Sequence, residues 1–380
     1  MRVREHVRWL AVVSLLGIVA ACVPPPDPAI VGSVPSPTPG SVPAFSHIVV
    51  VTLENKGEEE VFGPSGRAAA PYLNALADDG ALATNYFGIT HASLGNYLAM
   101  TSGQAPTWLA KIDCPFYNCS YPASVVNLAD QIEGAGKSWK AYMDGMTTPC
   151  QHGYPGSLDP YIFRIGTVAT YATRHNPFLY YDDITANPER CRAHDVPYGE
   201  LGRDLRAGQL PSFSYIVPDL CHDGHADECG LGGADRWAAA ELPKILDDPS
   251  FQDGGVLFVT FDEAEGSDNS GCCGSVPGGG KVGTIVVSPS HGRRGGYRST
   301  RPYNHYSLLR TIEDAWHLDL LGHASDAGAS PMTDLFTDAV PPADLPESPL
   351  PVGLPIAAGF IVATVVVRRR WVRPARGARA

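Results

Sequence analysis

Three clusters of polar residues in this 380-residue chain each come directly after an apolar run that is long enough for a buried strand. In open α/β sheets, ligands collect outside the carboxyl ends of such strands. A single carboxylate in that position is usually a turn residue or a helix cap. Three clusters that meet at one edge would instead supply hard oxygen ligands for a divalent cation. The clusters are Glu54-Asn55 after residues 47–53, Asp219 with His222 and His225 after residues 212–217, and Asp262-Glu263 after residues 256–261.

A second chemical feature is the segment His91-Ala92-Ser93-Leu94-Gly95-Asn96, where a predicted helix over residues 93–100 begins. Ser93 and Asn96 are three residues apart and therefore share one helix face. A hydroxyl at a helix N-terminus is well placed to attack phosphorus, because the N–H groups and the helix dipole there favour an anion. A metal ion bound to the same oxygen would lower its pKa and supply the nucleophile. Taken alone, Ser93 is more typical of a plain N-cap residue.

The sequence around Ser93 argues against a Ser-His-Asp acyl hydrolase. Those enzymes place the nucleophilic serine in a Gly-x-Ser-x-Gly turn. Here Ser93 is flanked by Ala92 and Leu94, and no glycine stands two residues before it.

The elements that must position these residues alternate between helix and strand. Four apolar runs have the length of strands, and their apolar residues are continuous rather than alternating. Such strands are typical of a mostly parallel sheet that helices cover on both faces. The sequence therefore predicts an α/β fold, a three-layer α/β/α sandwich with a mostly parallel central sheet. The predicted strands span residues 47–53, 212–217, 256–261 and 282–287, and the predicted helices span residues 72–82, 93–100, 125–133 and 306–316.

The N-terminal 22 residues have the composition of an export signal. Arginines precede an apolar run that ends in Val19-Ala20-Ala21-Cys22. A charged start, a short apolar stretch and small residues describe a secretory signal, and the last four residues resemble a lipobox. Residues 1–22 are therefore predicted to be a signal peptide with lipidation at Cys22, and ordinary cleavage near Ala21 is the alternative. The proline-rich residues 23–45 would follow as an extended spacer.

The C-terminal end predicts a second membrane attachment. Residues 351–367 are apolar and run directly into Arg368-Arg369-Arg370. An apolar span followed by basic residues is typical of a transmembrane helix with a cytoplasmic end. A buried core helix and a degraded sortase signal at residues 345–349 are the alternatives. The predicted organisation after the spacer is a catalytic domain over residues 46–335, a Pro-rich linker over 336–350, a transmembrane helix over 351–367 and a basic cytoplasmic tail over 368–380.

The nine cysteines support export. Eight remain if Cys22 is lipidated, an even number that could form four disulfides in an oxidising compartment. A zinc cluster is disfavoured because the paired C-x-x-C spacing is missing. The candidate pairs are Cys114 with Cys119, Cys221 with Cys229, Cys150 with Cys191, and Cys272 with Cys273.

The formal net charge of the chain is −12 at pH 7. Its two tails hold nine arginines and one acidic residue, so the part between them is more acidic still. So acidic a domain would not bind nucleic acid through its general surface. Any affinity for a phosphate group must therefore come from a local site.

Four segments together resemble the bacterial phosphoesterase family of the alkaline-phosphatase superfamily. That family contains acid phosphatases and phosphocholine-type phospholipases C. The small secreted actinobacterial acid phosphatases, some of which act on phosphoinositides, look most similar. The spacing of Ser93, Asn96 and Gly103 also resembles the nucleophile motif of the superfamily's nucleotide pyrophosphatase branch. The resemblance covers residues 46–335 and is carried by Glu54-Asn55-Lys56, Ala70-Pro71-Tyr72-Leu73, the segment from His91 to Leu98, and Phe261-Asp262-Glu263.

The resemblance implies roles for particular residues. Ser93 would be the nucleophile that becomes transiently phosphorylated, while Asn96, Asn55 and His91 would contact the substrate. One of three histidines would protonate the leaving oxygen, a role that suits a group titrating near neutrality. The implied ligands of a single divalent metal are Glu54, Asn55, Ser93, Asp262 and Glu263, and the implied catalytic histidines are His222, His225 and His305.

The chain departs from the family pattern at Ala92 and Gly95, where proline is usual. Both changes would loosen the turn without removing a reacting group. The pyrophosphatase branch holds a second metal, for which Asp219, His225 and His305 are candidates here. Their spacing differs from that branch, so one metal is the favoured prediction. The sequence leaves open the identity of that metal (Ca, Mg, Mn or Zn) and the oligomeric state.

The resemblance implies metal-dependent hydrolysis of phosphate monoesters, of small molecules or lipid head groups, through a phosphoserine at Ser93. Phospholipase C or another phosphodiesterase is the first alternative, because the same scaffold serves both. A non-catalytic membrane-anchored binding module is the second alternative, and the presence of Ser93 together with the implied metal ligands argues against it. With the two predicted anchors, the catalytic domain would lie on the extracellular side of the cell membrane.

Overall fold

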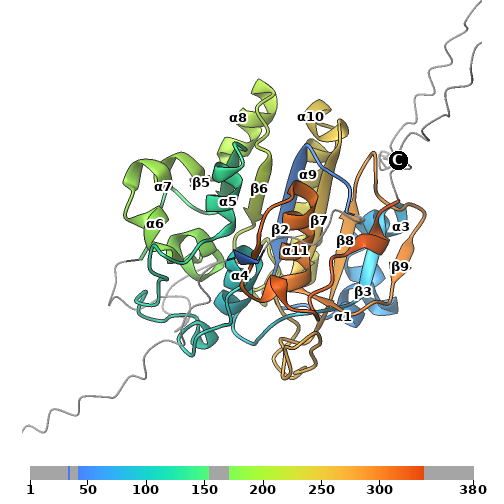
Figure 1. The fold of residues 1–380 in the computed structure, drawn as a ribbon. Coiled ribbons are helices and arrows are strands. Elements are labelled where there is room, and N and C mark those ends of the chain that lie inside the picture. Colours follow the sequence, from blue (N-terminus) through green and yellow to red (C-terminus); the bar gives the residue numbers. More distant parts are fainter. Residues whose placement is uncertain (1–32, 35–41, 154–170, 338–380) are drawn as a thin grey trace, which may run out of the picture. The chain divides into compact units, whose positions relative to one another are not determined.

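The computed structural model describes residues 33–34, 42–153 and 171–337, all of which belong to one compact unit over residues 1–339 (Figure 1). The predicted signal peptide, the predicted transmembrane helix over 351–367 and the basic tail lie outside the described residues. Among the helices that are described, none combines the length and the apolar character needed to cross a membrane.

A nine-stranded sheet forms the middle of this unit. Five neighbouring strands, in the order β7-β2-β6-β4-β5, run parallel to one another. Strand β8 is antiparallel to both of its neighbours, β7 and β3, while β9 and β10 pair with β3 in parallel. The prediction of a mostly parallel sheet is therefore confirmed. The strands are β2 (His47–Leu53), β3 (Ala81–Phe87), β4 (Trp139–Met143), β5 (Asp195–Pro197), β6 (Phe213–Val217), β7 (Gly255–Phe261), β8 (Lys281–Val287), β9 (Tyr297–Ser299) and β10 (Tyr303–Asn304).

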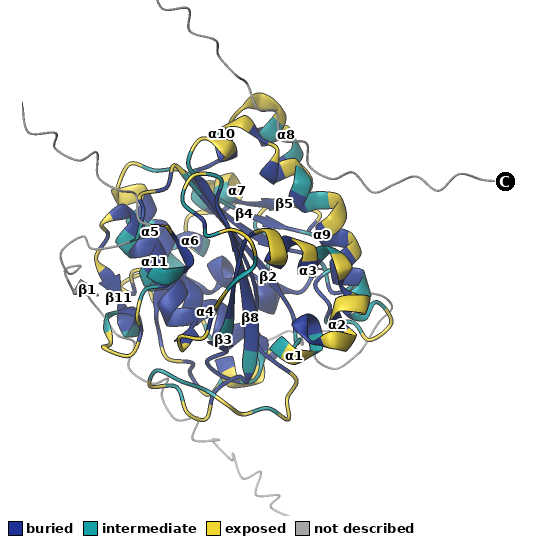
Figure 2. Ribbon diagram, turned by 90° about the vertical axis from the view of Figure 1, so that its right-hand side faces the viewer, coloured by how far each residue is buried: buried dark blue, intermediate teal, exposed yellow. Residues whose placement is uncertain are grey.

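Helices cover both faces of the sheet, as the continuous apolar strands predict. Every residue of β6 and β7 is buried. Figure 2 shows α4, α5 and α11 on one face and α1, α2, α3 and α9 on the other, which is the predicted three-layer arrangement. The helices are α1 (Glu58–Phe62), α2 (Pro64–Ala69), α3 (Pro71–Asp79), α4 (Ser93–Ser102), α5 (Leu128–Gly134), α6 (Asp182–Thr185), α7 (Pro188–His194), α8 (Gly199–Ala207), α9 (Gly230–Leu246), α10 (Pro249–Gln252) and α11 (His305–Trp316).

Two predicted boundaries were wrong for local reasons. The helix predicted over residues 72–82 stops at Asp79, because the backbone of Gly80 is not helical, with φ of −96° and ψ of −135°, and the chain then enters β3. The helix predicted over residues 125–133 begins at Leu128, because the Asn127 side chain caps it. A further pairing was not foreseen. Within the predicted spacer, β1 (Ser33–Val34) pairs with β11 (Leu320–Leu321).

All four predicted disulfides are present. Cys114–Cys119, Cys150–Cys191, Cys221–Cys229 and Cys272–Cys273 are bonded. Their presence agrees with the predicted oxidising compartment.

Gly103 ends α4 in the left-handed region, with φ of 67°, and its N–H bonds to the Ala99 carbonyl. A Cβ atom at this position would lie 2.2 Å from the Leu321 carbonyl oxygen. Gly103→Ala should therefore lower the free energy of unfolding by more than about 2 kcal/mol, because the left-handed penalty of roughly 1–2 kcal/mol adds to a backbone clash. Urea unfolding measures the loss. Gly136→Ala is the matched control, since Gly136 has a similar φ of 69° and open space around it. Equal losses in both variants would contradict the clash.

Candidate active site

The three polar clusters meet at one edge of the sheet, as predicted. Strands β7, β2 and β6 are adjacent and parallel, so the residues that follow them emerge together. Two backbone N–H groups after β2 connect the three clusters. The Glu54 N–H donates to the Asp223 carbonyl at 2.8 Å, and the Asn55 N–H donates to Asp262 Oδ1 at 3.0 Å. Glu54 and Asp262 are both fully buried. The edge of the sheet therefore presents two fixed, desolvated carboxyl groups.

Ser93 is the first residue of α4, and its side chain does not cap the helix. Its hydroxyl donates to Glu54 Oε2 at 2.9 Å, and the side chain is buried. Ala92 stands at the cap position with φ of 69°, a conformation that is costly for any residue with a Cβ atom and that is concentrated at functional sites. The plain N-cap reading of Ser93 is thus wrong. The helix start instead points the Ser93 hydroxyl at the carboxyl group of Glu54.

Asn96 fixes the loop that leads into α4. Its Oδ1 accepts from the N–H groups of Ile89 and Thr90, and its Nδ2 donates to the Thr90 carbonyl. Asn96 is fully buried. Its hydrogen bonds therefore fix the backbone of the loop before Ser93. The predicted contact of Asn96 with substrate stays a prediction.

Burial dominates the electrostatics of the site. Desolvation raises the pKa of Glu54 to about 7, and hydrogen bonds from Tyr97 and Ser93 oppose that rise. Burial, followed by the charge of Glu54, raises the pKa of Asp262 and of Asp223 well above the ordinary range. Burial and the charge of Asp262 also raise the pKa of Glu263. Carboxyl groups packed this closely are stable together only if they are protonated or if a cation offsets their charge.

A divalent cation fits this group of residues. Asp262 Oδ2 is buried and has no hydrogen-bond partner, which leaves one carboxylate oxygen for a ligand. Glu54 accepts hydrogen bonds from the Asn55 side chain and the Ser93 hydroxyl, and Asp262 accepts from the Asn55 N–H. The predicted ligand set itself stays a prediction. Glu263 differs from that set, because its carboxylate pairs with the His91 ring. Carboxylate and amide oxygens are the ligands that hard cations prefer.

The sequence analysis did not identify two residues of the site, Arg174 and His175. Arg174 is buried, with its Nε 3.7 Å from Asp113 Oδ2 and its Nη2 3.3 Å from His225 Nε2. His175 lies between Glu54 Oε1 and Asp223 Oδ2, at 3.3 Å from each. Burial, and then the Arg174 charge, lower its pKa well below the usual value. His175 also forms a possible cation-binding group with Glu54 and His225, and this group overlaps the predicted ligand set. The one available signal was the polar run Arg174-His175-Asn176 before a proline.

The three predicted catalytic histidines occupy different environments. His225 contacts Glu54 and Asn55 through Nδ1, and burial and the charge of Arg174 lower its pKa to about 4. His305 is buried behind Asp262, where its ring contacts the Asp262 carbonyl and the Tyr86 hydroxyl, and burial lowers its pKa to about 4. Neither ring would carry a proton near neutral pH. The predicted catalytic roles of His225 and His305 stay predictions.

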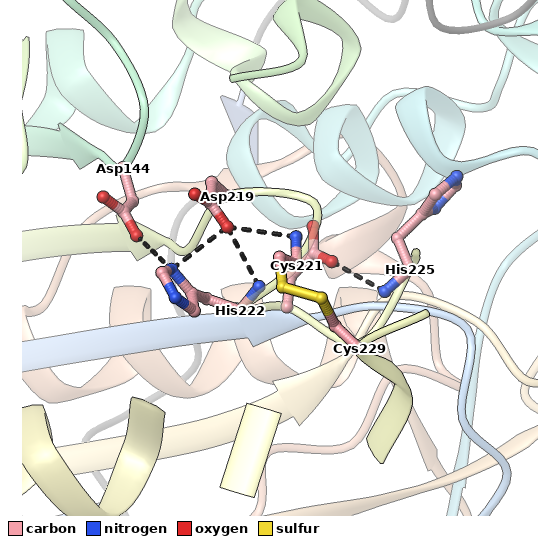
Figure 3. The surroundings of a disulfide bond; sticks show 7 residues. Asp144, Asp219, Cys221, His222, His225 and Cys229 are labelled. Atoms are coloured by element: carbon pink, nitrogen blue, oxygen red, sulfur yellow. Dashed lines mark hydrogen bonds and ion pairs between the residues drawn. A yellow bond between two sulfur atoms is a disulfide. The ribbon is translucent and has the colours of Figure 1, made fainter. Parts of the chain in front are cut away.

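His222 differs from both. Its Nδ1 lies 2.9 Å from Asp144 Oδ2 and 3.0 Å from Asp219 Oδ1, and the side chain is 43% exposed. Figure 3 shows that His222 and His225 point in different directions from the loop that the Cys221–Cys229 disulfide closes. Among the described residues, Asp144, Asp219 and His222 form the second possible cation-binding group. Asp219 and His222 thus form a group of their own, on the same loop as His225, which contacts Glu54.

The ring of His91 contacts Glu263 and the loop after β7. Its Nδ1 pairs with Glu263 Oε2, and its Nε2 bonds to the Asp268 carbonyl at 2.8 Å. These two contacts connect the loop before Ser93 to the loop after β7. The predicted substrate contact of His91 stays a prediction.

Comparison with known proteins connects this geometry to a protein family. The model of the Phosphoesterase family matches residues 53–319. A probable acid phosphatase of Kluyveromyces lactis is 29% identical over 75% of this chain and 61% of its own length. A phosphatidylinositol-3-phosphatase of Mycobacterium tuberculosis is 26% identical over 81% of this chain and 89% of its own length. A phospholipase C A of the same organism is 24% identical over 57% of this chain and 44% of its own length.

The chain therefore spans about three-fifths of the fungal relative's length. Among solved structures, an alkaline-phosphatase-superfamily protein of Vibrio parahaemolyticus superposes with a TM-score of 0.50 at 13% identity. The match covers 79% of this chain and 72% of that one. At this identity the match supports the fold alone.

Proposed function

Because the chain belongs to the Phosphoesterase family, we propose that it hydrolyses phosphate monoesters through a phosphoserine intermediate on Ser93. The observation that carries the proposal is the Ser93 hydroxyl, which begins α4 and donates to the buried carboxyl group of Glu54. A nucleophile held against an acceptor at a helix N-terminus suits attack on an anionic phosphoryl group.

The proposed reaction has two transfers. In the first, the Ser93 oxygen forms a bond to phosphorus as the ester bond breaks, the Ser93 proton passes to Glu54, and the alcohol leaves with a proton. In the second, water attacks the phosphorus of the phosphoserine and gives one proton back to the histidine that protonated the alcohol. The bond from phosphorus to the Ser93 oxygen breaks, that oxygen takes its proton back from Glu54, and inorganic phosphate leaves. A divalent cation held by Glu54, Asn55 and Asp262 would lower the pKa of the serine hydroxyl and offset phosphate charge.

His222 is the proposed proton donor to the leaving alcohol. Its Nδ1 is occupied by Asp144 and Asp219, so its Nε2 is the atom that can exchange a proton. A carboxylate partner orients a catalytic imidazole in this way. The neutral rings of His225 and His305 would instead hold Arg174 and Asp262 in place.

Arg174 is the proposed phosphate-binding cation. Its buried guanidinium lies beside Asp113 and His225, and charge-assisted hydrogen bonds are worth roughly 1.5–3 kcal/mol. Arg174→Gln should therefore lower kcat/KM for an aryl phosphate by about ten- to a hundredfold, by the usual conversion of 1.4 kcal/mol per factor of ten. Steady-state kinetics measure the loss. Arg67→Gln, which breaks an exposed ion pair with Asp78, is the control. An unchanged kcat/KM in Arg174→Gln would remove Arg174 from the proposal.

A substrate panel tests the ester class. Rates should be measured on an aryl phosphate, on a phosphatidylinositol phosphate and on phosphatidylcholine. We expect both monoesters to be hydrolysed and phosphatidylcholine to stay intact. Release of phosphocholine would favour the phospholipase C alternative, which the 24%-identical relative of that name also supports. Phosphate binding without turnover of any of the three would favour the binding module.

The predicted anchors complete the proposal. Lipidation at Cys22 and the transmembrane helix over residues 351–367 would hold the domain at the outer face of the cell membrane. Both segments lie outside the described residues, so they remain predictions. Mass spectrometry of the mature protein, and its distribution between membrane and soluble fractions, test them.

A further inference from the structure

The carboxyl edge of the sheet carries an unusual concentration of exposed apolar side chains. Five large apolar residues are exposed among those that the structure describes, and four of them lie on two loops at this edge, residues 104–120 after α4 and residues 264–280 after β7. Trp108, Ile112 and Phe116 are 40%, 46% and 43% exposed in the first loop, and Val276 is 74% exposed in the second. We call these four residues the apolar rim. Both loops lie on the lower side of Figure 1.

The loop that carries three of the rim residues is firmly built. The Cys114–Cys119 disulfide closes the part that carries Phe116, and a 3-10 turn over Ala110–Ile112 ends at Ile112. The backbone at two of the rim residues is thus constrained. Apolar groups gathered on one exposed surface are typical of an interaction site.

The same loop is bonded to the reacting helix. Asp113 Oδ1 accepts from the N–H of Leu94, the residue after Ser93, and Asp113 Oδ2 faces Arg174. The rim residues Ile112 and Trp108 stand one and five positions before this contact. A ligand that contacts Trp108 and Ile112 would therefore lie near the start of α4, where Ser93 stands.

A cavity of about 510 Å³ joins the two loops. Lys111 and Pro106 line one wall, Val276 and Pro277 line the other, and His91 contributes to the lining. Because His91 stands two residues before Ser93, this cavity is adjacent to the proposed site of reaction.

We propose that the apolar rim is a membrane-contacting surface, whose partner is the interfacial region of a phospholipid bilayer. Trp is enriched where an apolar core meets polar head groups, and Lys111 lies between Trp108 and Ile112 with its charge exposed. The Lys111 ammonium group could contact lipid phosphate groups while the apolar side chains beside it contact the acyl chains below. The rest of the acidic domain offers no general attraction to an anionic surface, so the contact must be local.

The rim acts independently of the predicted anchors and presents the Ser93 site to phosphate esters in the bilayer. That consequence rests on the proposed function, whereas membrane contact itself does not. Two experiments therefore separate the two claims. Both use the full chain, mixed with phosphatidylcholine vesicles or left without them, so that every variant carries the same tails.

The first experiment measures hydrogen exchange with and without vesicles that lack substrate. In the wild type, peptides covering residues 104–120 should become protected by vesicles, while peptides from α9 should not. The triple variant Trp108→Ser, Ile112→Ser, Phe116→Ser should lose that protection. No vesicle-dependent protection in the wild type would overturn the proposal. Protection that grows with protein concentration in the absence of lipid would also overturn it, by indicating a second copy of the chain.

The second experiment compares rates on two monoesters. The triple variant should hydrolyse vesicle-borne phosphatidylinositol phosphate at least about tenfold more slowly, and a soluble aryl phosphate at an unchanged rate, because only the first requires interfacial contact. Val126→Ser, at a 38% exposed apolar position outside both loops, should change neither rate. An unchanged vesicle rate, or equal loss on both substrates, would overturn the proposal. A wild type that hydrolyses neither monoester would contradict the proposed function. The hydrogen-exchange experiment would then test membrane contact by the apolar rim on its own.

Discussion

Ser93→Ala should lower the rate of aryl phosphate hydrolysis by at least about a thousandfold, because removing a catalytic nucleophile costs several orders of magnitude in kcat. The fold should survive. The substitution removes one buried hydrogen bond, from the Ser93 hydroxyl to Glu54 Oε2, and a bond of this kind contributes about 1 kcal/mol to stability. Thermal unfolding followed by circular dichroism checks that the helices and the sheet remain.

Ser102→Ala provides a matched control. Ser102 is also buried in α4, nine residues after Ser93, and its hydroxyl donates to the Leu98 carbonyl within the helix. The same chemical change at that position should leave turnover within about twofold of the wild type, because a surplus in-helix hydrogen bond is worth little.

Direct detection of the intermediate sharpens the test. Acid-quenched wild-type protein, mixed with excess substrate, should yield a peptide phosphorylated at Ser93 in mass spectrometry. Ser93→Ala should yield none. Full activity in that variant, or a phosphoryl group on another residue, would remove Ser93 from the role of nucleophile.

The part of this site that the sequence could predict is the part that local patterns encode. Glu54 and Asp262 each follow an apolar strand directly, so their position at the sheet edge depends only on the strands being parallel neighbours. Ser93 lies at a helix start that its own segment predicts. The same logic identified the strands β2, β6, β7 and β8 to within one residue at each end.

The rest depended on tertiary contacts that leave no local pattern. Arg174 and His175 stand in a short 3-10 turn over Thr173–His175, and they reach the site through contacts with Asp113, Asp223 and Glu54. Strand β3 was missed because its two Ala residues and its Asn have weak strand propensity. Packing between β8, β9 and β10 makes it a strand.

The partners of individual side chains were equally out of reach. Glu263 follows Asp262 directly, and adjacency in sequence suggested two ligands side by side. In a strand and its extension, however, successive side chains point to opposite faces. Glu263 accordingly pairs with the His91 ring, and its predicted role as a metal ligand stays a prediction.

Removal of divalent cations should inactivate the wild type, and Glu54→Gln should reproduce that loss permanently. The reason is the burial of Glu54, Asp262 and Asp223 in one place, which raises the pKa of all three carboxyl groups. A cation offsets this repulsion and should raise the melting temperature of the wild type, since a ligand that binds only the folded state stabilises it. Activity and thermal unfolding should be measured after chelation and after restoring Ca, Mg, Mn or Zn.

Glu313→Gln is the matched control for this substitution. Glu313 is a second buried glutamate, in α11, and burial raises its pKa as well. Its carboxylate accepts from the Leu321 N–H and makes no hydrogen bond or ion pair with the described residues around Ser93. Neutralising it should leave both the activity and the response to cations intact. A Glu54→Gln variant that still gained stability from the cation would remove Glu54 from the ligand set.

The pH dependence of stability gives a further, activity-free test of the same site. Burial raises the pKa of Glu54 from 4.5 to about 7 in the folded chain, so the folded state binds this proton more tightly than the unfolded state. Its contribution to stability is therefore complete below pH 4.5 and is lost as the pH rises through about 7. In chelator, urea unfolding should show the wild type losing stability over this interval more steeply than Glu54→Gln. With a saturating cation the difference should reverse, because the carboxylate then has its partner. Parallel pH profiles of unfolding free energy for the two proteins in chelator would show that Glu54 ionises as freely in the folded chain as in the unfolded one. That result would contradict the electrostatic argument for a cation at this edge of the sheet.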